Sequence, residues 1–274
     1  RLDKNLIKPE WVSVKDLTLD DLIIIPIPKY EVDNTSITND DCYLYGLMIG
    51  DGCVNKASTY NKITLHTSNK AKQIEFVKKY LTNKSLIYHE TVENNTTNIR
   101  WNKKTIVPFN YADLYDDSLE KRVHSRFLNL PLEKVKYIFK GIMYSDGCIH
   151  KELTLEMTSR QVIEAVRYIC LRMGILTSGY IRDRIGQTHI SCNKIFTCKK
   201  KSYVLRIPKH ETICEILNIC SGKYVNFLRH NHSLYTRIDN IEKKYYDGCV
   251  YDLEMENEHN YITHMGLVHN GGGK

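Results

Sequence analysis

Two aspartates occupy matching positions in a repeated stretch of the sequence. The run "LYGLMIGDGCVNK" at 44–56 leads into Asp51, and the run "FKGIMYSDGCIHK" at 139–151 leads into Asp146. Each follows apolar residues at helical spacing, so we expect both at the C-terminal ends of helices, where the macrodipole adds negative charge. Carboxylates brought together there repel each other, and a divalent cation removes that repulsion. We therefore expect a Mg²⁺ site, open to Mn²⁺, at Asp51, Asp146 and the preceding residues Gly50 and Ser145.

Small residues on the two helices would bring these carboxylates together. Gly46 and Gly50 lie four residues apart in the first helix, and Gly141 and Ser145 hold the corresponding places in the second. Small side chains at this spacing allow two helix backbones to approach closely. A single Asp-Gly pair is more simply the end of a helix and the start of a turn. Two copies at matched positions favour the paired site.

The similarity continues beyond these helices and indicates a tandem duplication. The stretch "ITLHTSN" at 63–69 matches "LTLEMTS" at 153–159, and each leads into an amphipathic helix, "KAKQIEFVKKYL" or "RQVIEAVRYICLRMG". Further strands follow in "NIRWNKKTIV" and "SYVLRI", so each unit consists of a helix, strands, a helix and more strands. The predicted fold class is α+β. The expected divisions are an N-side segment 1–34, a first repeat 35–132, a second repeat 133–235, a C-side segment 236–270 and a short tail 271–274.

Composition limits the possible classes of protein. The chain has 274 residues and a formal charge of +7, with basic residues interleaved among polar ones, which is typical of a surface that meets phosphate. Its nine cysteines include no C-x-x-C pair, so we expect free thiols in a reducing compartment. No stretch has the character of a signal peptide or a bilayer span. We expect an intracellular protein without a membrane partner, in the nucleus of a eukaryotic host and otherwise in the cytoplasm.

Both helical stretches resemble the LAGLIDADG motif of homing endonucleases, and "LYGLMIGDG" is similar to the form found within inteins. The resemblance implies an αββαββα fold present twice, with the motif helices at the central interface and with Asp51 and Asp146 binding the catalytic metal. It also implies a monomer that cuts both strands of a long, imperfectly palindromic double-stranded DNA site. Tyr45 and Lys140 replace a small residue of the motif, and we expect both side chains to point outward.

A metal held between carboxylates at a basic surface suits phosphodiester hydrolysis. The family places a basic residue in each half of the site, and the matching positions here are Lys121 and Lys223. His124 stands where the family has a proline, so the match around Lys121 is partial. Each lysine is alternatively a solvated surface charge.

DNA contacts are expected from the strands, because a two-stranded ribbon fits the major groove. The candidate segments are 54–68, 85–107, 149–158 and 177–207. Their basic members are Lys56, Arg100, Lys103, Lys104, Lys151, Arg182, Arg184, Lys199, Lys200 and Lys201. The "HNH" at 230–232 has no metal-finger context around it, so a nuclease of that other class is not favoured.

The C-terminal stretch "VYDLEMENEHNYITHMGLVHN" resembles the C-terminal splicing motifs of inteins. The side-chain amide of Asn270 could attack its own peptide carbonyl, form a succinimide and cut the chain. His269, His259 and Asp252 are groups that could position and move the protons of this step.

The segment "IKPEWVSVKDLTLDDLIIIPI" resembles the part of an intein that leads into its endonuclease. Arg1 is not a splicing nucleophile and residue 271 is Gly, so we expect splicing to be incomplete in this chain. The expected partners are a missing N-terminal intein fragment and host extein sequences, of which "GGGK" would be a stub. Two alternatives remain: a splicing element with an inactive nuclease passenger, and a DNA-binding regulator that does not cleave.

Overall fold

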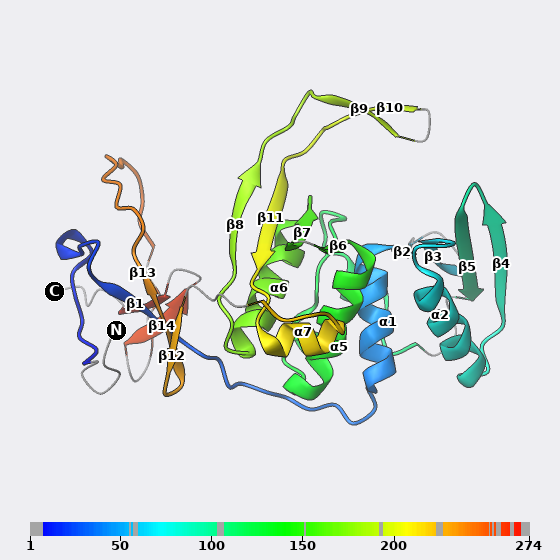
Figure 1. Cartoon of the computed structure of the whole chain (residues 1–274), viewed down its shortest axis with the longest axis horizontal. Helices are drawn as coiled ribbons and strands as arrows, with labels where there is room; N and C mark the ends of the chain where they lie inside the picture. The colour runs from blue at the N-terminus through cyan, green and yellow to red at the C-terminus, as the bar shows by residue number, and fades with distance from the viewer. Residues whose placement is uncertain are drawn as a thin grey trace.

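The computed structural model describes the chain in several stretches. The described residues are 8–54, 56, 60–102, 107–150, 152–191, 194–222, 227–251, 253, 255, 259–263 and 266–269. The fold is mixed α/β, with two helices, α1 (Asn39–Gly50) and α5 (Leu132–Ser145), packed side by side near its centre (Figure 1). Within the described residues, no helix has the length and apolar character needed to cross a bilayer.

The first unit follows α1. Its elements are β2 (Gly52–Val54), β3 (Tyr60–His66), α2 (Ala71–Asn83), β4 (Tyr88–Glu93), β5 (Thr96–Asn102), α3 (Tyr111–Leu114) and α4 (Ser125–Leu128). The four strands form an antiparallel sheet in the order β2-β3-β5-β4. Its buried side chains alternate with exposed ones along β3, as period-two patterning requires, and α2 packs its buried side chains into the same core.

The second unit follows α5 in the same way. Its elements are β6 (Gly147–Ile149), β7 (Leu153–Met157), α6 (Arg160–Arg172), β8 (Ser178–Arg182), β9 (Thr188–Ser191), β10 (Lys194–Thr197), β11 (Ser202–Ile207) and α7 (Glu211–Leu217). The antiparallel sheet has the order β6-β7-β11-β8, which corresponds to the order in the first unit. The strands β9 and β10 pair only with each other within the described part of the chain.

Strands from both sides of the repeats lie together at one end of the molecule (Figure 1). A short 3₁₀ turn at Val14–Asp16 precedes β1 (Leu22–Pro26), and β1 pairs with β13 (Ser233–Arg237), which pairs with β12 (Leu228–His230). A hairpin of β14 (Asn260–Thr263) and β15 (Gly266–His269) packs beside β1. The strands β12 and β13, which lie at the end of the predicted second repeat 133–235, thus form one sheet with β1.

The two central helices approach each other through their glycines. A Cβ atom on Gly46 would lie 2.3 Å from the carbonyl oxygen of Ile138, and one on Gly141 would lie 2.5 Å from that of Tyr43. These distances are impossible for a real side chain, so only glycine permits this crossing. The core of apolar side chains is continuous from one repeat through these helices to the other.

The expected outward orientation of Tyr45 is wrong. Its side chain is fully buried and stacks on Phe127, with ring centroids 4.0 Å apart. The residue lies on the flank of α1 away from the glycines, where the connection between the repeats packs against the helix. An aromatic ring fits there because that flank belongs to the core of the first repeat and not to the contact between the helices. Lys140 is partly exposed.

Candidate functional site

Asp51 and Asp146 lie at the ends of the two central helices, where each is the C-cap residue. The helix ends touch: a Cβ on Gly50 would lie 2.1 Å from Ser145 Oγ and 2.9 Å from Asp146 Oδ2. The structure therefore brings together the four residues predicted to form the metal site. Glycine at position 50 leaves the room in which the Asp146 carboxylate lies beside the end of α1.

The environment of this pair opposes its ionisation. Burial raises the pKa of Asp51 to about 6, and the nearby Asp146 acts in the same direction, whereas a bond to Lys70 lowers it. Burial also raises the pKa of Asp146, against the charges of Lys70 and Lys121. Two carboxylates and two lysines thus share one small region, and a cation bound there would be attracted by both acids.

Lys70 is a site residue that sequence reasoning missed. Its Nζ lies 2.5 Å from Asp51 Oδ2 and 2.5 Å from the carbonyl oxygen of Ser145, so one ammonium joins the ends of the two central helices. The residue is the N-cap of α2, four residues after the end of β3. A lysine at the start of a helix resembles an ordinary surface charge, so nothing in the local sequence marks it.

The second repeat has a different residue at the corresponding helix start. The N-cap of α6 is Ser159, whose hydroxyl accepts a hydrogen bond from the backbone N–H of Val162 and donates one to the carbonyl oxygen of Lys121 at 2.6 Å. At the start of its second helix, the first repeat thus has the Lys70 ammonium and the second repeat has the Ser159 hydroxyl. The electrostatic surroundings of the two carboxylates are not equivalent.

Lys121, the predicted basic residue of the first half, lies at the end of α1. Its Nζ donates to the carbonyl oxygens of Met48 at 2.5 Å and Gly52 at 2.6 Å. Burial lowers the pKa of Lys121 to about 8, and the nearby Asp146 and Asp51 carboxylates act in the opposite direction. This lysine serves as a C-terminal cap of the helix and also lies within electrostatic reach of both carboxylates.

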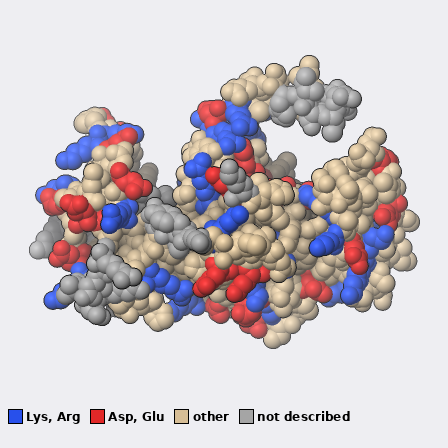
Figure 2. All heavy atoms as spheres, viewed as in Figure 1, with Lys and Arg blue, Asp and Glu red and all other residues tan. Residues whose placement is uncertain are grey.

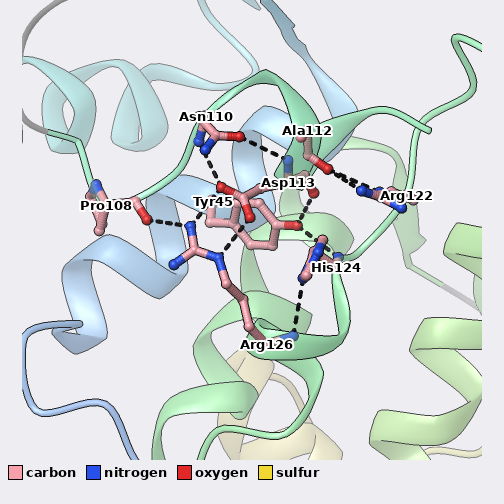
Figure 3. Close-up of polar contacts among 8 residues, drawn as sticks. All are labelled: Tyr45, Pro108, Asn110, Ala112, Asp113, Arg122, His124 and Arg126. Atoms are coloured by element: carbon pink, nitrogen blue, oxygen red, sulfur yellow. Dashed lines mark hydrogen bonds and ion pairs between the residues drawn. The ribbon is translucent and has the colours of Figure 1, made fainter. Parts of the chain in front are cut away.

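A hydrogen-bonded network around the buried Tyr45 holds the chain next to Lys121 (Figure 3). The hydroxyl of Tyr45 donates to the carbonyl of Asp113 and accepts from the backbone N–H of His124 at 3.1 Å. Arg126 binds the carboxylate of Asp113 through two N–H groups, at 2.7 and 2.6 Å. Arg122 adds bonds to the carbonyl of Ala112. The segment that carries Lys121 is thereby tied to α1, and His124 is part of that tie.

The donor set fits a hard divalent cation that takes its remaining ligands from water and phosphate. The Lys70 ammonium occupies a cation's place between the Asp51 carboxylate and the Ser145 carbonyl, and the Asp146 carboxylate lies beside the end of α1. Within the described part of the chain, no group of three or more His, Cys, Asp or Glu side chains could enclose a metal by itself. A site of this kind would hold Mg²⁺ or Mn²⁺ only together with a phosphate ligand and water.

The predicted DNA-binding residues lie in varied surroundings. Arg182 pairs with Glu156, Lys200 with Glu120 at 2.7 Å and Lys201 with Asp183 at 2.9 Å. The others that the structure describes are mostly exposed: Arg100, stacked over the Tyr60 ring, Lys56, near the Tyr111 ring, Arg184 and Lys199. The predicted residues Lys103, Lys104, Lys151 and Lys223 lie outside the described residues.

Two of the predicted splicing residues lie close together in the end sheet region. His259 directly precedes β14 and His269 ends β15, with ring centroids 6.3 Å apart, and Trp11 contacts His269 edge-on at 5.2 Å. The backbone pairing places Asn260 opposite His269. Asp252 and Asn270 lie outside the described residues. The structure thus brings both histidines to the strand that leads to Asn270.

Comparison with known proteins finds matches over most of the chain. The intein splicing domain family matches residues 5–270. An uncharacterized protein of Methanocaldococcus jannaschii is 24% identical over 309 residues, covering 96% of this chain and 37% of that protein. A DNA polymerase of Thermococcus hydrothermalis is 23% identical over 248 residues, covering 84% of this chain and 15% of the polymerase. Among solved structures, the homing endonuclease I-DmoI in complex with DNA and Mn gives 15% identity and a TM-score of 0.47, covering 69% of this chain and 99% of that one.

The architecture consists of two similar α/β units whose central helices bring two carboxylates together. Strands that precede and follow these units in the sequence form a separate sheet. The chain belongs to the intein splicing domain family, because the match spans nearly all of its length. It spans 37% and 15% of the two relatives, which are therefore much longer proteins.

Proposed function

We propose that the chain is the LAGLIDADG homing endonuclease of an intein and makes a metal-dependent double-strand break in a long, pseudo-palindromic DNA site. The observation that supports this most strongly is the contact between the ends of α1 and α5, which places Asp51 beside Asp146. A carboxylate pair at the meeting point of two repeats is suited to two phosphodiesters, one from each strand. The proposed enzyme works as a monomer inside the cell, on the DNA of its host.

The residues of the site divide the work. Asp51, Asp146 and the Ser145 carbonyl would hold Mg²⁺ or Mn²⁺, which when bound supplies activation of water and neutralisation of charge on the phosphate. Lys121 uses two N–H donors on Met48 and Gly52, which leaves one donor for a phosphate oxygen. Because its pKa is lowered to about 8, Lys121 can also give a proton to the departing 3′ oxygen near neutral pH. Lys70 keeps Asp51 ionised until the phosphate and its cation arrive.

The test uses DNA made by joining the genomic sequences on either side of the segment that encodes this chain. Wild type, Asp51→Asn and Asp146→Asn are incubated with that duplex and Mg²⁺, and binding is followed separately in EDTA. We expect wild type to cut both strands, and each variant to bind the duplex but lose cleavage by about a hundredfold or more. Equal products from the three proteins would refute the proposed site.

A second function is favoured by the two histidines beside the strand that leads to Asn270. We propose that the flanking strands are the C-side part of a splicing domain, in which His269 and His259, with Asp252, assist cyclisation of Asn270. The partners would be an N-terminal intein fragment and the host extein. Mass spectrometry after mixing with such a fragment would show cleavage after Asn270 in wild type, and none in Asn270→Ala. If cleavage occurs while no DNA is cut, the nuclease is an inactive passenger and splicing is the remaining activity.

A further inference from the structure

The two repeats differ strongly where their second hairpins turn. In the first repeat, β4 and β5 are joined by Asn94 and Asn95, both with positive φ (47° and 65°), so Glu93 pairs directly with Thr96. Such a two-residue turn closes a hairpin as tightly as the backbone allows. In the second repeat, the pairing of β8 with β11 ends at Arg182 and Ser202, and residues 183–201 run outward between them. We call residues 183–201 the arm; all of it except 192 and 193 is described.

The described part of the arm is a ribbon of two paired strands with a turn at 184–187, where the backbone N–H of Gln187 donates to the carbonyl of Arg184. The strands β9 and β10 pair along it, and below them Gly186 donates to the carbonyl of Cys198 and Cys198 donates to that of Gln187, both at 2.9 Å. Gly186 has φ of +83° and open space around it, which marks the bend, and the pair Lys201–Asp183 ties the two sides at the base. In Figure 1 the arm leaves the sheet of the second repeat and bends toward the first repeat. Figure 2 shows open space beneath it.

The charge of the arm is also unlike that of the other hairpin. From 183 to 201 the sequence has five basic side chains and one acidic one. These are Arg184, Lys194, Lys199, Lys200, Lys201 and Asp183. The hairpin of the first repeat, residues 88–102, has Arg100 against Glu90 and Glu93. The arm therefore carries four net positive charges and residues 88–102 carry one net negative charge, so a polyanion is attracted more strongly to the arm than to the hairpin of the first repeat.

Two basic side chains on the arm are available to a partner. Arg184 and Lys199 are exposed and form no ion pair within the described part of the chain, whereas Lys200 and Lys201 are held by Glu120 and Asp183. Ile185, next to Arg184, is 54% exposed, and Ile195, farther out, is 75% exposed. Exposed aliphatic groups next to cations suit contact with the sugars and grooves of a nucleic acid, because the charged backbone and the apolar sugar edges alternate there.

We propose that the arm is a clamp that closes over duplex DNA from the side of the second repeat and binds phosphates outside the reach of the four-stranded sheets. This inference rests on the proposed function, which supplies the duplex. Phosphate contacts release counterions, so each one adds about 0.9 to the slope of log affinity against log salt. Because the hairpin of the first repeat has no such excess of positive charge, we expect the second repeat to bind the DNA more tightly than the first repeat does.

The first test is a charge variant that leaves the ribbon intact. Arg184→Gln with Lys199→Gln is compared with the control pair Lys72→Gln with Lys79→Gln, two exposed lysines on α2 with the same total charge change. Binding to the joined-flank duplex is measured in EDTA over a range of salt. We expect the arm variant to lose about 1 to 2 from the salt slope and at least tenfold in affinity at low salt, with the control unchanged. Equal slopes for the two variants would overturn the clamp.

The second test locates the contact. Residues 187–198 are replaced by a Gly-Gly turn, and hydroxyl-radical footprints of wild type and the shortened protein are compared on the same duplex. We expect the shortened protein to lose protection at one flank only and to dissociate at least tenfold faster. An unchanged footprint with an unchanged dissociation rate rejects the arm while leaving the nuclease proposal standing. Failure of wild type to bind the duplex at all rejects both.

Discussion

Replacing Lys70 by methionine should change the ionisation of Asp51. The ammonium lies 2.5 Å from Asp51 Oδ2, and the Asp51 side chain is only 17% exposed, so solvent screens this pair weakly. Burial already holds the pKa of Asp51 at about 6 in spite of that bond. An opposite charge at such a distance lowers a carboxyl pKa by about one to three. Its removal should therefore weaken the acidity of Asp51 about tenfold or more, which corresponds to at least about 1.4 kcal/mol.

Two measurements follow from this magnitude. The first is a titration of the Asp51 carboxyl carbon by NMR in Mg²⁺-free buffer, which should show a higher pKa in Lys70→Met than in wild type. The second is the pH profile of DNA cleavage, whose acidic limb should move up by about one pH unit or more. At pH 7 the variant should be slow, and at high pH it should recover, because Asp51 then ionises without help.

Controls separate this explanation from its competitors. Lys72→Met removes an exposed charge from the same helix and should leave both the titration and the profile unchanged. Lys70→Arg keeps the charge and should retain most of the wild-type profile. A loss of cleavage in Lys70→Met that is equally large at every pH, with an unchanged Asp51 titration, would refute the reasoning and assign Lys70 to the substrate.

The remaining predictions concern stability. Gly141→Ala should cost about 3 kcal/mol or more in unfolding experiments, since its Cβ would meet only backbone atoms, including the carbonyl oxygen of Tyr43 at 2.5 Å; Lys140→Ala is the control. Tyr45→Phe should cost about 1–3 kcal/mol, because it leaves the Asp113 carbonyl and the His124 N–H without their buried partner. The raised pKa of Asp51 contributes stability below pH about 4 that is lost as pH rises through about 6, so in Mg²⁺-free buffer wild type should lose more stability than Asp51→Asn between pH 4 and 8.

The approach of the two central helices could be predicted from the sequence because its cause is local. Only glycine fits at positions 46 and 141, because a Cβ there would meet a backbone oxygen of the other helix. Helix geometry then fixes the distance from each glycine to Asp51 or Asp146. Gly46 and Gly141 each lie five residues before the aspartate of their helix, so helices that contact each other at these glycines also have neighbouring C-terminal ends. Residue type and spacing therefore determine the position of both carboxylates.

Other parts of the site depend on contacts between distant segments and leave no local pattern. Lys70 reaches Asp51 only because β3 returns the chain to the end of α1, and a lysine there has no feature that separates it from a surface charge. The inward orientation of Tyr45 depends on the connection 107–126, whose path no periodicity specifies. The sequence also marked 177–207 as a basic segment, but only the pairing of β8 with β11 shows that 183–201 leaves the sheet.

The duplication and the chemistry of the site follow different constraints. The glycines that join α1 and α5 must be retained in both repeats, because a side chain at either crossing would separate the helices and the carboxylates with them. The helix starts are free of that constraint: Lys70 and Ser159 are both N-caps, and neither adds apolar surface to the core. One repeat can therefore place an ammonium against Asp51 while the other places a hydroxyl against the carbonyl of Lys121. A symmetric backbone thus supports a site whose two halves carry different charge.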